Sequence, residues 1–201
     1  MSSPIDFYFD FSSPYGFLAS EKIETLAARH GRVVDWHPVL LGVIFKQTGA
    51  APLTMIPLKG DYSRRDMARS ARFHGVAGFR IPSKFPIPSQ AAARLVLWQK
   101  QRDAARVGVV VHALYRAFFV DDIDISAPDA ALAAVAKCDV DTATARAAID
   151  DPAIKDALKE ANDQAIARGV FGSPFIVVDG EPFWGVDRLD QVERWLATGG
   201  W

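Results

Sequence analysis

The stretch DFSSPYGF, residues 10–17, contains the residues whose types and spacing first suggest chemistry. Its two serines, Ser12 and Ser13, follow an apolar run and precede Pro14 at the beginning of an amphipathic one. A serine at such a junction either caps a helix or takes part in a reaction. Serine is a poor nucleophile without a general base, and no histidine lies nearby in the sequence. A reactive role for Ser13 would therefore rest on its hydrogen bonding.

Metal, disulfide and nucleotide chemistry lack their usual sequence patterns. The four histidines include no pair at metal-ligand spacing and have no Gly-x-Ser-x-Gly companion, so neither a zinc site nor a hydrolase triad is predicted. The single cysteine, Cys138, cannot form an internal disulfide or anchor a zinc cluster alone. No Gly-x-Gly-x-x-Gly or P-loop sequence is present. We therefore expect no metal and no nucleotide.

The bulk composition restricts the class of partner. The chain has 201 residues, of which 50% are hydrophobic, and a formal net charge of -1. These values suit one folded domain, or one with a large insertion, and give no sign of affinity for nucleic acid. No apolar run approaches the ~20 residues that cross a bilayer, and residues 1–10 lack the features of a secretory signal. We expect a cytoplasmic protein that acts on a small molecule, with no membrane partner.

The elements that position the serines begin with a strand, a helix and a second strand. Residues 4–11 alternate apolar and other side chains, which predicts a strand. Residues 14–31 place apolar side chains at helical intervals and end at Gly31. Residues 32–42 form a second apolar run, in which Pro38 marks a sheet edge or the end of the strand. The helix is long enough for a parallel crossover.

A long segment, residues 61–168, follows and shows almost no strand signal but several well-marked helices. Ser126 and Asp151 are predicted N-caps of two of them. Pro152 suits the first helical position, and Gly169 suits a helix end. The segment is therefore predicted to be a helical insertion.

Strand character returns after residue 169. Two short apolar runs flank Asp179-Gly180, a dipeptide typical of a hairpin turn. An amphipathic helix then closes the chain, with apolar residues on one face at Leu189, Val192, Trp195 and Leu196. The predicted order is strand, helix, strand, then a helical block, then two strands and a helix.

This order resembles the thioredoxin fold with a helical insertion. The expected fold class is α/β, a thioredoxin-like domain of residues 1–60 and 169–201 with an inserted all-helical domain of residues 61–168. In that fold the first strand brings the reactive residue to a helix N-terminus, where free N–H groups and the helix dipole favour an anion. Ser13 begins the stretch that replaces the Cys-x-x-Cys of redox members. Because both cysteines are absent, disulfide exchange at this site is excluded.

Five segments together closely resemble the 2-hydroxychromene-2-carboxylate isomerases and the related kappa-class glutathione transferases. They are FYFDFSSPYGFLA, LLGVIFKQTG, PLKGDY, GVFGSPFIVVDG and FWGVDRLDQV, and the resemblance spans nearly the whole chain. It implies a glutathione cofactor whose sulfur is contacted by the serine that matches Ser13. A thiol of pKa about 8.5 is mostly protonated at neutral pH unless hydrogen bonds and a helix N-terminus stabilise its thiolate, so this role is chemically sound.

The resemblance also implies the other residues of the glutathione site. Ser173 is expected to turn its backbone toward the cysteinyl part, before a cis proline at Pro174. Lys59 would meet the glycyl carboxylate, whereas most of the basic run that it begins is expected to be a solvated helix face. The γ-glutamyl end is expected to lie against Trp184, Gly185, Val186 and Asp187. The Asp187 carboxylate would accept from the ammonium group, cap the last helix, or do both, since one carboxylate can accept several hydrogen bonds.

The expected activity is that of a glutathione-dependent isomerase. It would act on an unsaturated aromatic or cyclic acid by reversible thiolate addition, bond rotation and elimination, and the resemblance implies a homodimer. One alternative is a kappa-class-like transferase that leaves glutathione attached to an electrophile, and another is a non-catalytic thioredoxin-like module that binds peptides. The sequence departs from the family at Ala50 and Pro88, where asparagine is frequent, which leaves the substrate open.

Overall fold

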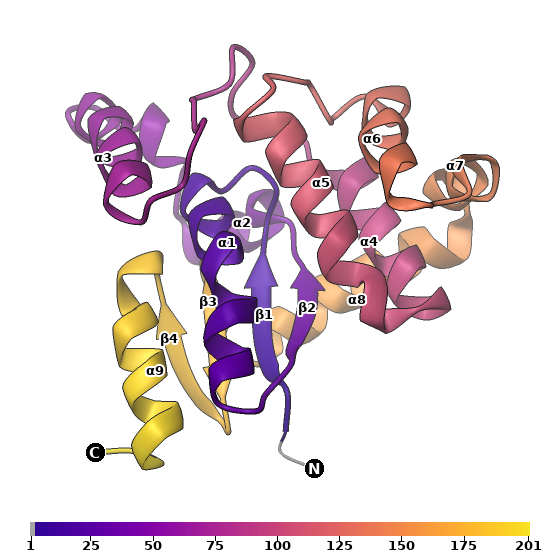
Figure 1. The fold of residues 1–201 in the computed structure, drawn as a ribbon. Coiled ribbons are helices and arrows are strands. Elements are labelled where there is room, and N and C mark those ends of the chain that lie inside the picture. The colour runs from indigo at the N-terminus through magenta and orange to yellow at the C-terminus, as the bar shows by residue number, and fades with distance from the viewer. Residues whose placement is uncertain (1–2) are drawn as a thin grey trace.

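Figure 1 shows the chain as a computed structural model, which describes residues 3–201. Within that range, a four-stranded sheet in the order β2-β1-β3-β4 forms the centre of the molecule. The strands are β1 (Ile5–Phe9), β2 (Val34–Pro38), β3 (Phe175–Val178) and β4 (Glu181–Trp184). Strands β1 and β2 run parallel, whereas β3 is antiparallel to both of its neighbours.

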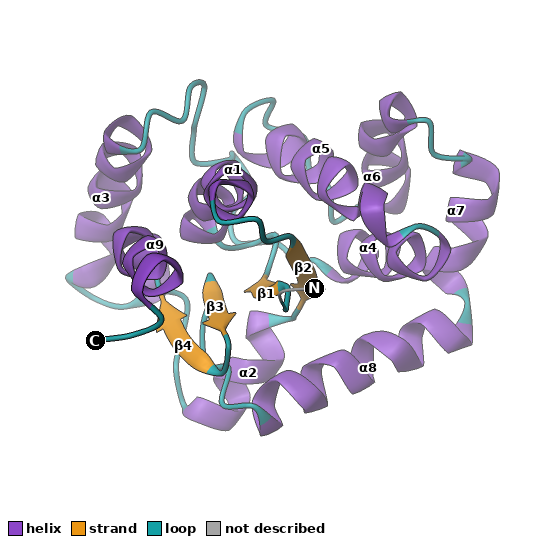
Figure 2. Ribbon diagram, turned by 60° about the horizontal axis from the view of Figure 1, so that its bottom comes forward, coloured by secondary structure: helices purple, strands orange, loops and turns teal. Residues whose placement is uncertain are grey.

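Helices cover both faces of the sheet. On one face lie α1 (Pro14–Arg29) and α9 (Leu189–Thr198), and on the other lie α2 (Leu41–Thr48) and α8 (Pro152–Ala167) (Figure 2). The remaining α-helices, which all lie between β2 and β3 in the sequence, are α3 (Lys59–Phe73), α4 (Gln90–Arg102), α5 (Val107–Phe119), α6 (Pro128–Val135) and α7 (Thr142–Asp150). Short 3-10 helices link some of these elements, namely η1 (Leu53–Met55), η2 (Ala104–Arg106), η3 (Ala136–Cys138) and η4 (Val186–Arg188). Among the described residues, no helix is both long and apolar enough to span a bilayer.

Helix α1 begins where the serine pair ends. Ser13 is its N-cap, and the Ser13 side chain accepts a hydrogen bond from the N–H of Gly16. Pro14, which has no N–H to satisfy, takes the first helical position. The chain leaves the helix through Gly31, whose φ of 63° is easily adopted by glycine. The predicted helix start and stop are therefore confirmed.

The sheet and the inserted helices share one continuous apolar core. Phe9 of β1, Phe17 of α1 and Phe119 of α5 belong to the same buried cluster. The rings of Phe17 and Phe119 stack with their centroids 5.4 Å apart. A second cluster, on the opposite face of the sheet, joins Tyr8 of β1 to Ile44 of α2. Helix α1 is thus held between the sheet and α5.

The predicted order of elements is confirmed, but a helix was missed. The apolar run of residues 32–42 was expected to be one strand, yet the strand ends at Pro38, and residues 41–48 form α2. Proline cannot donate to a strand ladder, which explains why β2 ends there at the edge of the sheet. The hairpin turn is confirmed, because Asp179 and Gly180 both have positive φ, at 52° and 92°.

One predicted helix cap is wrong and another is confirmed. Ala127, not Ser126, is the N-cap of α6, because Pro128 occupies the first helical position. Ser126 instead donates its hydroxyl to a carboxylate oxygen of Asp124. Asp151 caps α8 as expected, since its side chain accepts a hydrogen bond from the N–H of Ala153 at 2.8 Å.

Candidate active site

A cavity of about 2240 Å³ lies beside the end of β1 and the N-terminus of α1. Clefts that hold one small ligand usually measure about 300–1,000 Å³, so this cavity has room for a peptide cofactor and a second molecule. Six residues predicted for the site line it together, namely Ser13, Ser173, Trp184, Gly185, Val186 and Asp187. Lys59, the seventh, is not part of its wall.

The Ser13 hydroxyl connects α1 to the loop before β3. Ser13 is only 4% exposed, and its Oγ accepts a hydrogen bond from the N–H of Gly16 at 3.0 Å. The same hydroxyl donates to the carbonyl oxygen of Ser173 at 2.8 Å. The Ser173-Pro174 peptide is cis, as the family resemblance implied. Ser13 is therefore both a helix cap and a hydroxyl at the cavity, so the two roles considered from the sequence are compatible.

A buried tyrosine of the inserted helices packs beneath the contact between Ser13 and Ser173, on the side of α5. Tyr115 of α5 is fully buried, and its hydroxyl donates to the carbonyl oxygen of Asp10 at 2.9 Å. Burial raises the pKa of Tyr115 well above its ordinary value, so the phenol keeps its proton. Gly16 leaves space for this hydroxyl, because an added Cβ would lie 2.7 Å from it and 2.8 Å from Ser173 Oγ. The close packing under Ser13 thus requires glycine at position 16.

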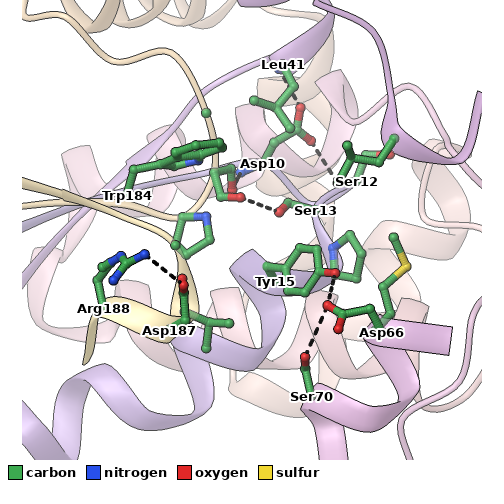
Figure 3. Close-up of a pocket in the computed structure, with 18 of the residues that line it drawn as sticks. Asp10, Ser12, Ser13, Tyr15, Leu41, Asp66, Ser70, Trp184, Asp187 and Arg188 are labelled. Carbon is green, nitrogen blue, oxygen red and sulfur yellow. Dashed lines mark hydrogen bonds and ion pairs between the residues drawn. The ribbon is translucent and has the colours of Figure 1, made fainter. Parts of the chain in front are cut away.

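The Asp10 carboxylate joins three segments at the edge of the cavity (Figure 3). Its Oδ1 accepts from the N–H of Ser12 at 2.8 Å and from the hydroxyl of Ser89 at 2.7 Å. Its Oδ2 accepts from the N–H of Leu41, at the start of α2, at 2.6 Å. Burial raises the pKa of Asp10, although these three hydrogen bonds act in the opposite direction.

The predicted γ-glutamyl subsite, with Trp184 and Asp187, lies to the left of Ser13 and Tyr15 in Figure 3. Trp184 is 55% exposed there, and its ring meets Phe171 edge to face with centroids 4.9 Å apart. The Asp187 carboxylate is exposed and lies 3.2 Å from the guanidinium of Arg188. Arg188, not Asp187, is the N-cap of α9. The simple capping role for Asp187 is therefore not observed.

Helix α3 forms the other side of the cavity. The Tyr15 hydroxyl of α1 donates to a carboxylate oxygen of Asp66 in α3 at 2.6 Å, and burial together with Asp66 raises the pKa of that phenol. Asp66 also forms an ion pair with Arg69, which lines the cavity. Lys59 is exposed at the beginning of α3. Lys59 was predicted for the site in preference to the arginines of this run, yet the cavity wall contains Arg69 and not Lys59.

A group with the composition of a metal site lies away from this cavity. Asp6, Asp35 and His37 bring three potential ligand atoms within 4.8 Å of one another. Lys100 already forms an ion pair with Asp35, and Arg168 lies 3.5 Å from a carboxylate oxygen of Asp6. These cations balance the carboxylates, so we assign the group to a salt-bridge network between β1, β2 and their neighbouring helices.

Two residues that support Ser13, Tyr115 and Asp10, were not predicted from the sequence. Tyr115 lies in an apolar helical run and has no local signal of a polar role. Asp10 is a single acidic residue between two phenylalanines at the end of a strand, which was the available clue. Of the two departures from the family pattern, Ala50 lines the cavity and Pro88 does not.

The fold and the site define a class of protein. Residues 4–197 match the family model described as a DSBA-like thioredoxin domain, which confirms the expected thioredoxin fold with its helical insertion. Similarity to relatives over nearly the full length of the chain identifies a smaller family within this class. The chain belongs to the family of the 2-hydroxychromene-2-carboxylate isomerases.

Three known proteins illustrate the relationship. The chain is 31% identical to a 2-hydroxychromene-2-carboxylate isomerase of Sphingobium xenophagum over 98% of this chain and 99% of the relative. It is 25% identical to the human glutathione S-transferase kappa 1, over 96% of this chain and 92% of the relative. The solved structure of a 2-hydroxychromene-2-carboxylate isomerase superposes with a TM-score of 0.85 and 26% identity, covering 96% of this chain and 94% of that one.

Proposed function

We propose that the protein is a glutathione-dependent isomerase of the 2-hydroxychromene-2-carboxylate isomerase type. The observation that carries this proposal is the Ser13 hydroxyl, which lines the cavity at the N-terminus of α1 and contacts the Ser173 carbonyl. The isomerases and the kappa-class transferases among its relatives support an enzyme that uses glutathione in one of these two ways.

The groups around the cavity fit the functional groups of glutathione. The Ser13 hydroxyl and the positive end of the α1 dipole suit a thiolate. The exposed Asp187 carboxylate suits the ammonium group of the γ-glutamyl end, against the surface of Trp184, Gly185 and Val186. The Ser173 backbone would pair with the cysteinyl part. Lys59 would meet the glycyl carboxylate from the beginning of α3, which requires its long side chain to turn toward the cavity.

Ser13 acts as a hydrogen-bond donor in this proposal. A hydroxyl has one proton, which Ser13 now donates to the Ser173 carbonyl, while the Gly16 N–H fixes the position of the Ser13 oxygen. Rotation of this hydroxyl redirects the proton toward a sulfur in the cavity without moving the oxygen. Glutathione, when bound, would supply the thiolate for reversible addition to a conjugated carbon of the substrate, and Ser13 would hold that sulfur by its hydrogen bond.

The remaining cavity wall suits an unsaturated aromatic or cyclic acid. Phe45 and Phe171 line it together with Trp184, and such rings provide an apolar surface for a flat substrate. Lys46 of α2 also lines the cavity and would attract the substrate carboxylate. The protein therefore contributes thiolate stabilisation and the orientation of two reactants.

Two other functions use the same fold. A kappa-class-like transferase is favoured by the transferases among the relatives, and it would consume glutathione, whereas an isomerase only requires it. A peptide-binding module without catalysis would bind through the Ser173-Pro174 edge and would not depend on Ser13. The homodimer and the cytoplasmic location expected from the sequence stay predictions.

The test is calorimetric titration of glutathione into the wild type, Ser13→Ala and Ser12→Ala, with ultraviolet difference spectra of the bound thiol across pH. Ser12 is the matched control, because its hydroxyl accepts from the N–H of Ile87 at 3.2 Å instead of contacting Ser173. We expect the wild type and Ser12→Ala to lower the thiol pKa, and Ser13→Ala to bind without lowering it. Absence of glutathione binding to the wild type would exclude both the isomerase and the transferase. Turnover of an unsaturated acid with glutathione fully recovered would then separate the two.

A further inference from the structure

Asp10 is a buried acidic residue beside the cavity for which the proposed reaction has no direct use. It is 4% exposed, and each of its carboxylate oxygens accepts at least one hydrogen bond. Two of its three donors are the backbone N–H groups of Ser12 and Leu41, which can only donate. A buried carboxylate is costly unless hydrogen bonds compensate for lost solvation, so three donors around Asp10 indicate a site built for an acceptor with two oxygens.

Asp10 forms hydrogen bonds with both serines that meet at the cavity, Ser13 and Ser173, and with Ser12 beside them. Its carboxylate fixes the N–H of Ser12, and its carbonyl oxygen accepts from the N–H of Ser13 at 2.8 Å. Its own N–H donates to Ser173 Oγ at 3.1 Å. One residue therefore sets both sides of the contact between the Ser13 hydroxyl and the Ser173 carbonyl.

Asp10 also fixes a helix that forms part of the cavity wall. The N-cap of α2 is Leu40, which makes no side-chain capping bond. Instead, Asp10 accepts from the N–H of Leu41, and the buried Asn162 of α8 accepts from the N–H of Leu40 at 2.8 Å. These two side chains replace the missing cap, and α2 then carries Phe45 and Lys46 to the cavity.

We propose that Asp10 is the positioning residue of the active site, which holds the Ser13 hydroxyl and the Ser173 carbonyl in place relative to each other and to α2. The inference rests on the proposed function to the extent that a thiolate is the group that Ser13 receives. Asp10 acts on Ser13 indirectly: its carboxylate fixes Ser12, Ser89 and Leu41 around it, and the backbone of Asp10, held in this way, binds the N–H of Ser13 and the hydroxyl of Ser173.

The Asp10→Asn variant separates this role from two others. Asparagine keeps the size of the side chain but replaces one carboxylate oxygen by an NH2 group, which only donates. Because Ser12 and Leu41 donate to different oxygens of Asp10, one of these two N–H groups would then face a donor. A positioning role predicts that the pKa of the bound thiol rises toward about 8.5, because Ser13 is displaced. A purely electrostatic role predicts that it falls, because a negative charge near the thiolate is removed. A purely structural role predicts lower stability and an unchanged thiol pKa.

The first measurement is the pH titration of bound glutathione by ultraviolet absorbance in the wild type, Asp10→Asn and Asp6→Asn. Asp6 is the matched control, because it lies in β1, the strand that ends just before Asp10, and its carboxylate is bonded to His37. We expect Asp10→Asn to lose most of the lowering of the thiol pKa and to weaken binding by about ten-fold, which corresponds to the low end of the contribution of one charged hydrogen bond. A thiol pKa equal to or below that of the wild type would overturn the proposal.

A second measurement needs no ligand, so it decides about Asp10 even if the wild type fails to bind glutathione and the proposed function is wrong. The Gly16 N–H lies in the first turn of α1, where no helical acceptor exists, and donates to Ser13 Oγ. Its hydrogen exchange therefore reports the position of that oxygen. We expect exchange about ten-fold faster in Asp10→Asn, with the mid-helix amide of Ile23 unchanged.

Ser89→Ala removes one donor to the Asp10 carboxylate and keeps the other two, the N–H groups of Ser12 and Leu41. It should therefore increase the exchange rate of the Gly16 N–H by less than Asp10→Asn does. If Asp10→Asn does not fold, Gly16 exchange in Ser89→Ala is the measurement that tests the proposal. Gly16 exchange equal to that of the wild type in the folded variants would overturn the proposal.

Discussion

The hydroxyl oxygen of Ser13 lies 2.8 Å from the carbonyl oxygen of Ser173, a residue 160 positions further along the chain. This contact joins the N-terminus of α1 to the loop that precedes β3. The two segments meet because β1, which precedes α1, pairs with β3 in the sheet. The Gly16 N–H fixes the same oxygen from the helix side. The Ser13 oxygen is therefore held between two backbone groups, and only its hydroxyl proton can still rotate toward another acceptor.

Replacement of Ser13 by cysteine tests the environment at the start of α1. With Cys138→Ser as the background, we expect the thiol of Ser13→Cys to have a pKa below about 7.5, because a helix N-terminus stabilises a thiolate. The rate of alkylation by iodoacetamide across pH measures this value. The natural Cys138 is a useful comparison, since burial raises the pKa of its thiol. A pKa at or above about 8.5 for Ser13→Cys would show that this helix end does not favour an anion.

Gly16→Ala tests the packing under the site. The added Cβ would lie 2.7 Å from the buried Tyr115 hydroxyl and 2.8 Å from Ser173 Oγ, so we expect the free energy of unfolding to fall by about 1–3 kcal/mol. Urea denaturation measures the change. Gly42→Ala is the control, because no atom outside its chain neighbours and the backbone of its own helix lies within 4 Å of the added Cβ, and alanine favours a helix by up to about 1 kcal/mol. Equal stability of Gly16→Ala and the wild type would mean that α5 can move away from α1.

The sequence alone predicted the elements whose boundaries are set by local chemistry. Ser13-Pro14 at the beginning of α1, Asp151-Pro152 at the beginning of α8 and Asp179-Gly180 in the hairpin each impose a backbone geometry by themselves. Helix α2 has no such signal, because its cap is supplied by Asp10 and Asn162 from distant parts of the chain. Its short apolar run fits a strand as well as a helix, and the tertiary contacts decide.

The same distinction applies to the site. Six of the seven predicted residues line one cavity, because family motifs at both ends of the chain meet at the centre of the sheet. Tyr115 and the carboxylate contacts of Asp10 depend on the packing of α5, α2 and the Ser89 loop against β1. No periodicity or local motif in the sequence encodes such long-range polar contacts, so only the structure reveals them.

Lys59→Ala tests the predicted residue that the cavity wall does not include. If the ammonium group of Lys59 turns toward the glycyl carboxylate, the variant should bind glutathione about five-fold more weakly at low ionic strength, and salt should reduce the difference. Calorimetry at two salt concentrations measures both effects. Arg65→Ala is the control, since Arg65 is exposed on the same helix and lies outside the wall. The same affinity for the two variants would remove Lys59 from the site and leave Arg69 as the cation of α3 to examine.

The stability of the protein should decrease between about pH 6.5 and pH 9 because of His112, which links α5 to α1. Burial acts to lower the pKa of His112, but its contacts with Glu21 and Glu24 outweigh burial and raise that pKa from 6.5 to about 9. A raised histidine pKa stabilises the folded state fully below the unfolded pKa, and the contribution disappears as pH rises through the folded pKa. Because the Glu24 side chain is 48% exposed, we expect a contribution of about 1–2 kcal/mol after solvent screening.

Urea denaturation at about pH 6 and pH 9.5 should show this loss in the wild type. The same loss is expected in the control His74→Gln, because the pKa of His74 in the wild type is instead lowered by burial. In His112→Gln the loss should be smaller by that amount, and the remainder should come from His37, where burial acts to lower the pKa but Asp35 and Asp6 raise it. An unchanged pH dependence in His112→Gln would exclude His112 as a source of the loss.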